Sequence, residues 1–257
     1  MTKAPFTAHN RLLLYLMILV SGSVSAQVSV KDSAVGMVMI RPSFALQAPS
    51  GDLASRFGMN QSIGMAAGYK WANGWILGAE ATLFFGSKIK EQGVFTGLTT
   101  AEGTIVGVDG LYGDIRLFER GYTVMATLSK LFPVKKPNPN CGFVVETGLG
   151  FMQHKIKIDD KKNAVPAVRD PYVKGYDRLT NGVALRQFVG YLHVGNRRLV
   201  NFYGGVEAIQ GFTASRRSYN YSTMSVDDAP RIDLLFGLRV GWIIALFKEA
   251  PDPFYMY

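Results

Sequence analysis

The chain has 257 residues, of which 48% are hydrophobic and 18% are charged, and it contains a single cysteine. Its length fits one domain, and one cysteine cannot form an internal disulfide, which excludes a fold held together by disulfides. The formal net charge of +9 raises the question of nucleic-acid binding. However, the sequence has no cluster of Lys and Arg interleaved with stacking aromatic residues, so we expect no nucleic-acid partner.

Residues 1–26 have the order of a secretory signal peptide. Lys3 and Arg11 precede the apolar run 12–20, and the small residues at 24–26 (Val-Ser-Ala) follow it, in the pattern that a signal peptidase recognises. A helix over this run would rise only about 14 Å, far less than a bilayer core of roughly 30 Å, which argues against a membrane anchor. We therefore expect 1–26 to be a signal peptide and the rest to be exported.

After residue 26, segments with alternating apolar and small or polar side chains recur between turn residues. Segments of about ten such residues are typical of transmembrane strands. The predicted strands lie at about 35–47, 62–70, 75–86, 122–129, 143–151, 183–195, 200–208 and 232–246. The first and the sixth are irregular, and the pattern does not settle which of their faces points inward.

The last of these strands has the clearest pattern. Its even-numbered positions from Ile232 to Leu246 are all large and apolar, whereas the opposite face includes Asp233, Arg239 and glycines. A soluble ligand-binding barrel would place its large apolar residues inside and its charges outside. Because glycines and carboxylates share one face here, the pattern favours a barrel that is embedded in a membrane.

The connections between the predicted strands alternate in length. Short turns lie at 71–74, 132–140 and 196–198, and long polar joins lie near 48–60, 87–119, 156–181 and 214–230. Short periplasmic turns that alternate with long external loops are typical of outer-membrane barrels.

Within the second long join, 103–108 and 114–118 form either an extra hairpin or part of a folded external loop. We predict an all-β, antiparallel up-and-down transmembrane β-barrel over 27–247 with about eight strands, or ten if that hairpin forms.

The faces that we expect to point inward carry charged residues. An eight-stranded barrel is only wide enough for side chains to fill it, and buried charges must then pair. We therefore expect an internal salt-bridge plug, with a narrow ion path as the alternative. The plug residues are Glu80, Glu146, Glu207, Arg239 and Arg41.

No residue pattern indicates a catalytic centre, a cofactor or a metal site. We expect His154 to end the fifth strand on the external side and His193 to lie toward the periplasm, too far away to cooperate. Neither belongs to a serine-hydrolase motif, and two separated histidines make no metal site. Cys141 lies beside prolines with no histidine nearby. We therefore expect an inert thiol and a protein that is not an enzyme.

Cations in the long loops are expected to contact lipopolysaccharide, since each charge near an anionic surface contributes about 1 kcal/mol. These residues are Lys155, Lys157, Lys161, Lys162, Arg216 and Arg217. Residues 248–257 contain two prolines, which stop a strand from continuing the sheet. We expect them to form a periplasmic tail, in which Phe254, Tyr255 and Tyr257 either dock a partner or complete an assembly signal.

The segments 119–124 (Glu-Arg-Gly-Tyr-Thr-Val) and 238–242 (Leu-Arg-Val-Gly-Trp), followed by the aromatic tail, carry a resemblance to a known family. With them the chain resembles small outer-membrane β-barrel proteins of the Bacteroidota, over nearly all of 27–257 but on motifs of low specificity. It is similar in architecture to OmpA/OmpX-type barrels without a periplasmic domain. The resemblance implies an outer-membrane location and a role as an accessory component of type IX secretion, and it carries over no catalytic residue.

Three functions are compatible with these observations. The first is a non-enzymatic integral barrel that serves as a structural or accessory subunit of an envelope assembly, with outer-membrane lipids, lipopolysaccharide and a protein as partners. The second is a narrow pore or passive transporter. The third is a lipid-modifying outer-membrane enzyme.

Overall fold

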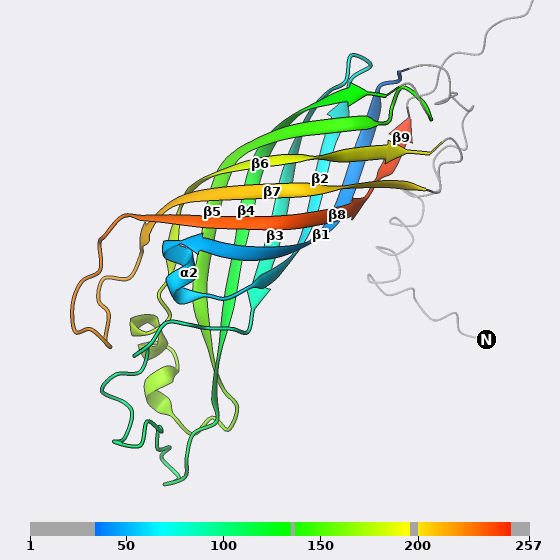
Figure 1. Cartoon of the computed structure of the whole chain (residues 1–257). Helices are drawn as coiled ribbons and strands as arrows, with labels where there is room; N and C mark the ends of the chain where they lie inside the picture. The colour runs from blue at the N-terminus through cyan, green and yellow to red at the C-terminus, as the bar shows by residue number, and fades with distance from the viewer. Residues whose placement is uncertain (1–33, 135–136, 196–199, 248–257) are drawn as a thin grey trace, which may run out of the picture. The chain divides into compact units, whose positions relative to one another are not determined.

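A computed structural model describes residues 34–134, 137–195 and 200–247, and these residues form an antiparallel β-barrel (Figure 1). Its strands are β1 (Met37–Gly51), β2 (Asn60–Lys70), β3 (Trp75–Gly86), β4 (Ile115–Pro133), β5 (Gly142–Asp160), β6 (Thr180–Val194), β7 (Asn201–Ser215), β8 (Arg231–Trp242) and β9 (Ile244–Phe247). The short helices α2 (Asp52–Arg56), η1 (Pro166–Val168) and η2 (Tyr172–Gly175) lie in the connections. Within the described ranges, no helix is long and apolar enough to cross a membrane.

The sheet closes on itself because β1 pairs with both β2 and β8. Phe44 in β1 lies opposite Ile63 on one side and Val240 on the other. β9 continues the pairing of β8 with β1 after a break at Ile243, so that Ile244 lies opposite Ile40. A closed ring leaves no strand edge unpaired. The predicted all-β antiparallel barrel is therefore confirmed, with eight strands around the ring of described residues and β9 as the extension of the last.

The strands present large apolar side chains outward, as the alternating pattern predicts. In β8, Phe236, Leu238 and Val240 are each more than half exposed, whereas Asp233 and Arg239 are buried inside. The prediction for 232–246 is thus confirmed. β1 and β6, whose facing the sequence left open, point their odd-numbered and even-numbered residues inward, respectively.

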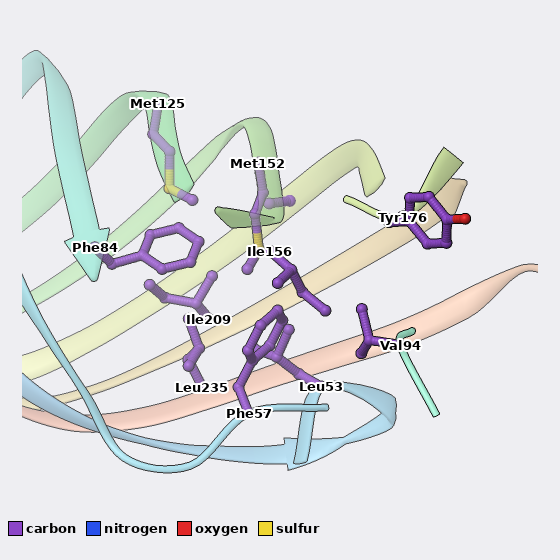
Figure 2. Packing of buried hydrophobic residues seen from close by; sticks show 11 residues of the cluster. Leu53, Phe57, Phe84, Val94, Met125, Met152, Ile156, Tyr176, Ile209 and Leu235 are labelled. Atoms are coloured by element: carbon purple, nitrogen blue, oxygen red, sulfur yellow. The ribbon is translucent and has the colours of Figure 1, made fainter. Parts of the chain in front are cut away.

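The barrel interior also contains large apolar side chains, which corrects the expectation of a small or charged inner face. One layer lies toward the short turns and comprises Met37, Met39, Ile76, Leu131, Val144, Phe188, Leu192, Val194, Tyr203 and Ile243. A second layer lies toward the long loops and comprises Leu53, Phe57, Phe84, Val94, Met125, Met152, Ile156, Tyr176, Ala184, Ile209 and Leu235, most of which Figure 2 shows. Leu53 of α2 and Phe57, which follows it, enter this layer from a loop and fill the space between the strands.

The long join after β3 contributes no further strand to the ring. Residues 115–118 are the start of β4, and 103–108 contain only an isolated bridge between Val106 and Tyr112. The extra hairpin is therefore absent from the described residues, and β4 and β5 extend beyond the barrel as a long pair, each of 19 residues. The predicted signal peptide, the turn at 196–198 and the tail at 248–257 lie outside the described residues.

Leu149 tests the assignment of the outer face, because it is 58% exposed near the middle of β5. If this face contacts lipid, Leu149→Arg should lower the free energy of unfolding in phospholipid vesicles by about 2–4 kcal/mol, since a cation near the bilayer midplane is poorly solvated. Val108→Arg is the matched control, because Val108 is 79% exposed in the loop between β3 and β4. Urea titration followed by tryptophan fluorescence measures both variants, and equal losses would contradict the assignment.

Candidate functional site

Six buried side chains of opposite charge form one continuous chain across the barrel interior. In the order of their contacts, they are Arg41, Glu146, Arg186, Glu80, Arg239 and Glu207. We call this set the ion chain. It contains three guanidinium groups and three carboxylates, so its formal charges balance.

The contacts of the ion chain are direct. Arg41 Nη2 lies 2.8 Å from Glu146 Oε2, and Arg186 bridges Glu146 and Glu80 with its two terminal nitrogens. Arg239 lies 2.6 Å from Glu80 through Nη1 and 2.7 Å from Glu207 through Nε. Each residue is at most 5% exposed. The low dielectric of such an interior strengthens hydrogen bonds between charged groups but makes any unpaired charge costly.

Strand register explains why residues far apart in the sequence meet. Arg41 of β1 lies opposite Ala66 of β2, which lies opposite Glu80 of β3. All three point inward, and the small Ala66 leaves room for the longer side chains around it. Contacts to Glu146 and Arg239 then cross the lumen instead of following neighbouring strands.

Neutral polar groups complete the coordination of the carboxylates. Ser129 donates to Glu146, Thr82 donates to Glu80 at 2.9 Å, and Gln47 donates to Glu207 at 2.8 Å. Each carboxylate thus accepts hydrogen bonds from at least one guanidinium group and one neutral group, so its oxygens are already engaged by the protein. The arrangement is therefore suited to closing the interior, and the apolar layers on both sides of it separate it from water.

The structure thus brings together all five residues of the predicted plug and adds Arg186, which the sequence analysis missed. The irregular pattern of β6 concealed it, because the polar Gln187 beside it points outward. A signal was nevertheless present in the charges. Three inward glutamates against Arg41 and Arg239 leave one carboxylate without a cation, and a third inward arginine was needed to balance it.

His154 forms a second buried polar cluster with Asp233. Its Nε2 lies 2.9 Å from Asp233 Oδ2, Thr213 also donates to Asp233, and the ring of Phe57 packs edge-on at 5.7 Å. The expectation that His154 ends its strand at the external side was wrong, because β5 continues to Asp160 and His154 is fully buried. In a catalytic triad the hydroxyl contacts the imidazole. Here the hydroxyl contacts the carboxylate, so the cluster does not have the geometry of a triad.

Cys141 has a histidine close by, which corrects the sequence expectation. Its Sγ lies 3.6 Å from His193 Nδ1, and Asn138 and the backbone of Val194 also surround it. The thiol is completely buried. A reactive cysteine needs partial exposure and a stabilised thiolate, whereas burial here raises the pKa of Cys141 although the backbone N–H of Val194 donates to its sulfur at 3.3 Å.

The six cations of the predicted lipopolysaccharide surface lie at the long-loop end, in two different settings. Lys155, Lys157, Lys161, Lys162 and Arg216 are exposed, and Arg216 donates to Asn181 at 2.6 Å. Arg217 instead forms an ion pair with Asp177, whose hydrogen bonds raise the pKa of Arg217.

The mouth at this end is covered by α2 and a group of paired charges. Arg56 lies 3.4 Å from Glu91 and 3.8 Å from Asp227, and burial lowers the pKa of Arg56 although both carboxylates favour its charged form. Arg178 also binds Glu91, at 2.7 Å. In the described residues, no three His, Cys, Asp or Glu side chains group as a metal site would require.

Comparisons with known proteins find similarity only at the level of solved structures. No protein-family model and no curated protein matches the sequence. The chain is similar to Ail of Yersinia pestis, solved in complex with the heparin analogue sucrose octasulfate, with a TM-score of 0.44 and 12% identity over 81% of this chain and 99% of that one. It is also similar to Neisserial surface protein A (TM-score 0.42, 11% identity, 80% and 96%) and to the outer membrane protein OprG from Pseudomonas aeruginosa (0.40, 12%, 86% and 100%).

Arg186→Met should lower the free energy of unfolding by about 3–5 kcal/mol, because it leaves the buried carboxylates in excess. Arg186→Met/Glu80→Gln should be less destabilised, since the pairs of Arg41 with Glu146 and of Arg239 with Glu207 remain balanced. Arg116→Met is the control: its side chain is 54% exposed beside Asp114, and the loss should stay within about 1 kcal/mol. Urea unfolding in vesicles measures all three. A double variant that is less stable than Arg186→Met would argue against charge balance as the cause.

Cys141 is the only thiol in the chain, so thiol labelling reports on one position. We expect no reaction with a maleimide while the barrel is folded and complete reaction after unfolding in urea, because the sulfur is buried. Mass spectrometry counts the labelled fraction. Rapid labelling of the folded protein would contradict the inert environment described for this residue.

Proposed function

We propose that this protein is an integral outer-membrane β-barrel with a closed interior, which acts as a non-enzymatic structural or accessory subunit of the cell envelope. The observation that carries the proposal is the balanced ion chain, enclosed between two apolar layers. The ion chain and the two layers fill the described interior and leave room in it for neither an aqueous path nor a reactive group.

The outer surface supports the membrane location. Each strand of the ring exposes large apolar side chains on its outer face, and aromatic residues gather near the turn between β2 and β3: Tyr69, Trp71 and Trp75. Such an apolar band with aromatic residues at its border is typical of outer-membrane barrels. In water, an apolar surface of this extent would favour aggregation.

The interior supports a closed barrel over a pore. A channel needs inward polar groups that water can reach, whereas the residues of the ion chain are buried and already bonded to one another. Phe84, Met125 and Leu235 cover the ion chain toward the long loops, and Met39, Ile76 and Phe188 cover it toward the short turns. An ion would have to displace both layers and break the salt bridges.

An accessory role follows from what remains available for contact. With the interior filled, binding surfaces are left on the loops and at the ends of the chain. The exposed cations at the long-loop end are suited to the phosphates of lipopolysaccharide. We assign to Phe254, Tyr255 and Tyr257, outside the described residues, the role of docking a protein partner in an envelope complex such as a type IX secretion assembly.

In planar bilayers the purified protein should show no stable open state at either polarity, because the ion chain blocks the lumen. Heat-modifiable migration of the same sample establishes that it is folded, and a general porin inserted in the same way gives the positive control. A stable cation-selective conductance that Glu146→Ala abolishes would overturn the closed barrel and favour a pore.

The accessory role is tested by co-purification from native membranes, with a second small barrel of the same membrane carrying the same tag as the control. A protein partner should be retained by the full chain and lost when Phe254, Tyr255 and Tyr257 are replaced by Ala, while heat-modifiable migration stays unchanged. A change in the lipid A profile of a deletion strain would instead favour a lipid-modifying enzyme.

A further inference from the structure

A groove with a volume of about 580 Å³ lies on the outer surface of the barrel, over β2 to β5. Ile63, Leu83, Phe85 and Tyr122 supply apolar lining, and Arg120 and Lys155 are the only cations among its lining residues. Together with Gln153, which also lines it, the two cations give a mainly apolar groove an amphipathic character.

The two cations lie directly opposite each other, Arg120 in β4 and Lys155 in β5. Like charges at directly opposed positions destabilise an antiparallel pair. Among the described residues neither forms an ion pair with a carboxylate: Arg120 donates to the backbone carbonyl of Glu119 at 2.6 Å and lies over the ring of Phe118 at 5.2 Å. Farther along the same face of β4, Arg116 has an acidic neighbour at 3.6 Å, Asp114. The cation pair thus lacks the compensation that the neighbouring arginine has.

The height of this pair in the barrel matches the border of a membrane. Trp75 lies next to a short turn and opposite Lys130 of β4. Arg120 lies on the same strand, ten residues before Lys130. Ten residues along a tilted strand correspond to about 25 Å of height, which is the height of the apolar band in outer-membrane barrels. Trp75 and Arg120 therefore mark the two borders of that band.

Below the cations the outer face is apolar. Val124 and Leu149 are more than half exposed, and the rings of Tyr122 and Phe151 lie 6.1 Å apart. A ligand at the groove would thus have an anionic group at the membrane border and a hydrocarbon part directed into the band. A phosphorylated lipid has both parts in this order, whereas a free anion would leave the apolar lining unused.

We propose that this groove binds one phosphorylated lipid from the leaflet on the long-loop side, with its phosphate between Arg120 and Lys155 and an acyl chain along Ile63 and Leu83. Arg suits this task because its planar guanidinium can bind two phosphate oxygens at once. The site rests on the proposed membrane location, and it is distinct from a diffuse contact of the loop cations with the membrane surface.

The test uses the full chain purified in detergent micelles and native mass spectrometry, which counts bound lipids. The probes are a diacyl phosphatidic acid and the diacylglycerol with the same chains, which differ only in the phosphate. Arg120→Gln/Lys155→Gln should weaken binding of phosphatidic acid at least tenfold and leave diacylglycerol unchanged. The matched control is Lys161→Gln/Lys162→Gln, which removes two charges from an exposed turn and should change binding less than twofold.

Equal losses in both double variants would overturn the site and leave only diffuse attraction by the loops. Inorganic phosphate that competes as well as the lipid would also overturn it, because the acyl chain would then contribute nothing. The proposed membrane location is tested separately, by heat-modifiable migration and by flotation with vesicles. A protein that floats but binds both probes equally would refute the lipid site alone, and a protein that does not float would refute both proposals.

Discussion

Closure of the barrel and pairing of the ion chain depend on each other. A charged side chain buried without a partner costs several kcal/mol. The middle of this interior holds six buried charged side chains, so each of them needs a partner. Arg41 and Arg239 come from strands at opposite ends of the ring sequence, β1 and β8, which become neighbours only when the sheet closes. Arg239 can pair with Glu207 on the neighbouring strand β7, but its contact with Glu80 on β3 and the contact of Arg41 with Glu146 on β5 join strands that face each other only in the closed barrel. The closed shape thus makes the charges tolerable, and the charges in turn hold opposite walls together.

The apolar layers on either side of the ion chain determine how strong its hydrogen bonds are. They keep water away, so the hydrogen bonds between charged groups are stronger than they would be in a hydrated lumen. Toward the long loops, part of that layer comes from outside the strands, since α2 and Phe57 bring side chains into the mouth. Closure at this end therefore depends on a loop as well as on the sheet, which links the order of the external surface to the packing of the interior.

Alternation along single strands was enough to predict the barrel, because every second residue of β3, β5 and β8 points outward. It failed in β1, where the apolar Met37 and Met39 face inward, and in β6, where the polar Gln187 faces outward, and the failure in β6 hid Arg186. Contacts that depend on register could not be predicted. His154 and Asp233 are separated by 79 residues, and Cys141 and His193 by 52, so only the paired strands show that they meet. Of the two alternatives left open for the join after β3, the described residues show no extra hairpin: 103–108 contribute only an isolated bridge, and 115–118 begin β4.

The order of contacts in the ion chain has a consequence for assembly. Arg186 can pair with Glu146, and Arg239 with Glu207, between neighbouring strands, but the contacts of Arg41 with Glu146 and of Arg239 with Glu80 cross the lumen and must wait for the first and last strands to join. In an unclosed sheet, Arg41 would lack Glu146 and Arg239 would lack Glu80. The last step of assembly is therefore the one that gains the most electrostatic stabilisation, and it favours a concerted closing of the seam over a sheet that remains half open.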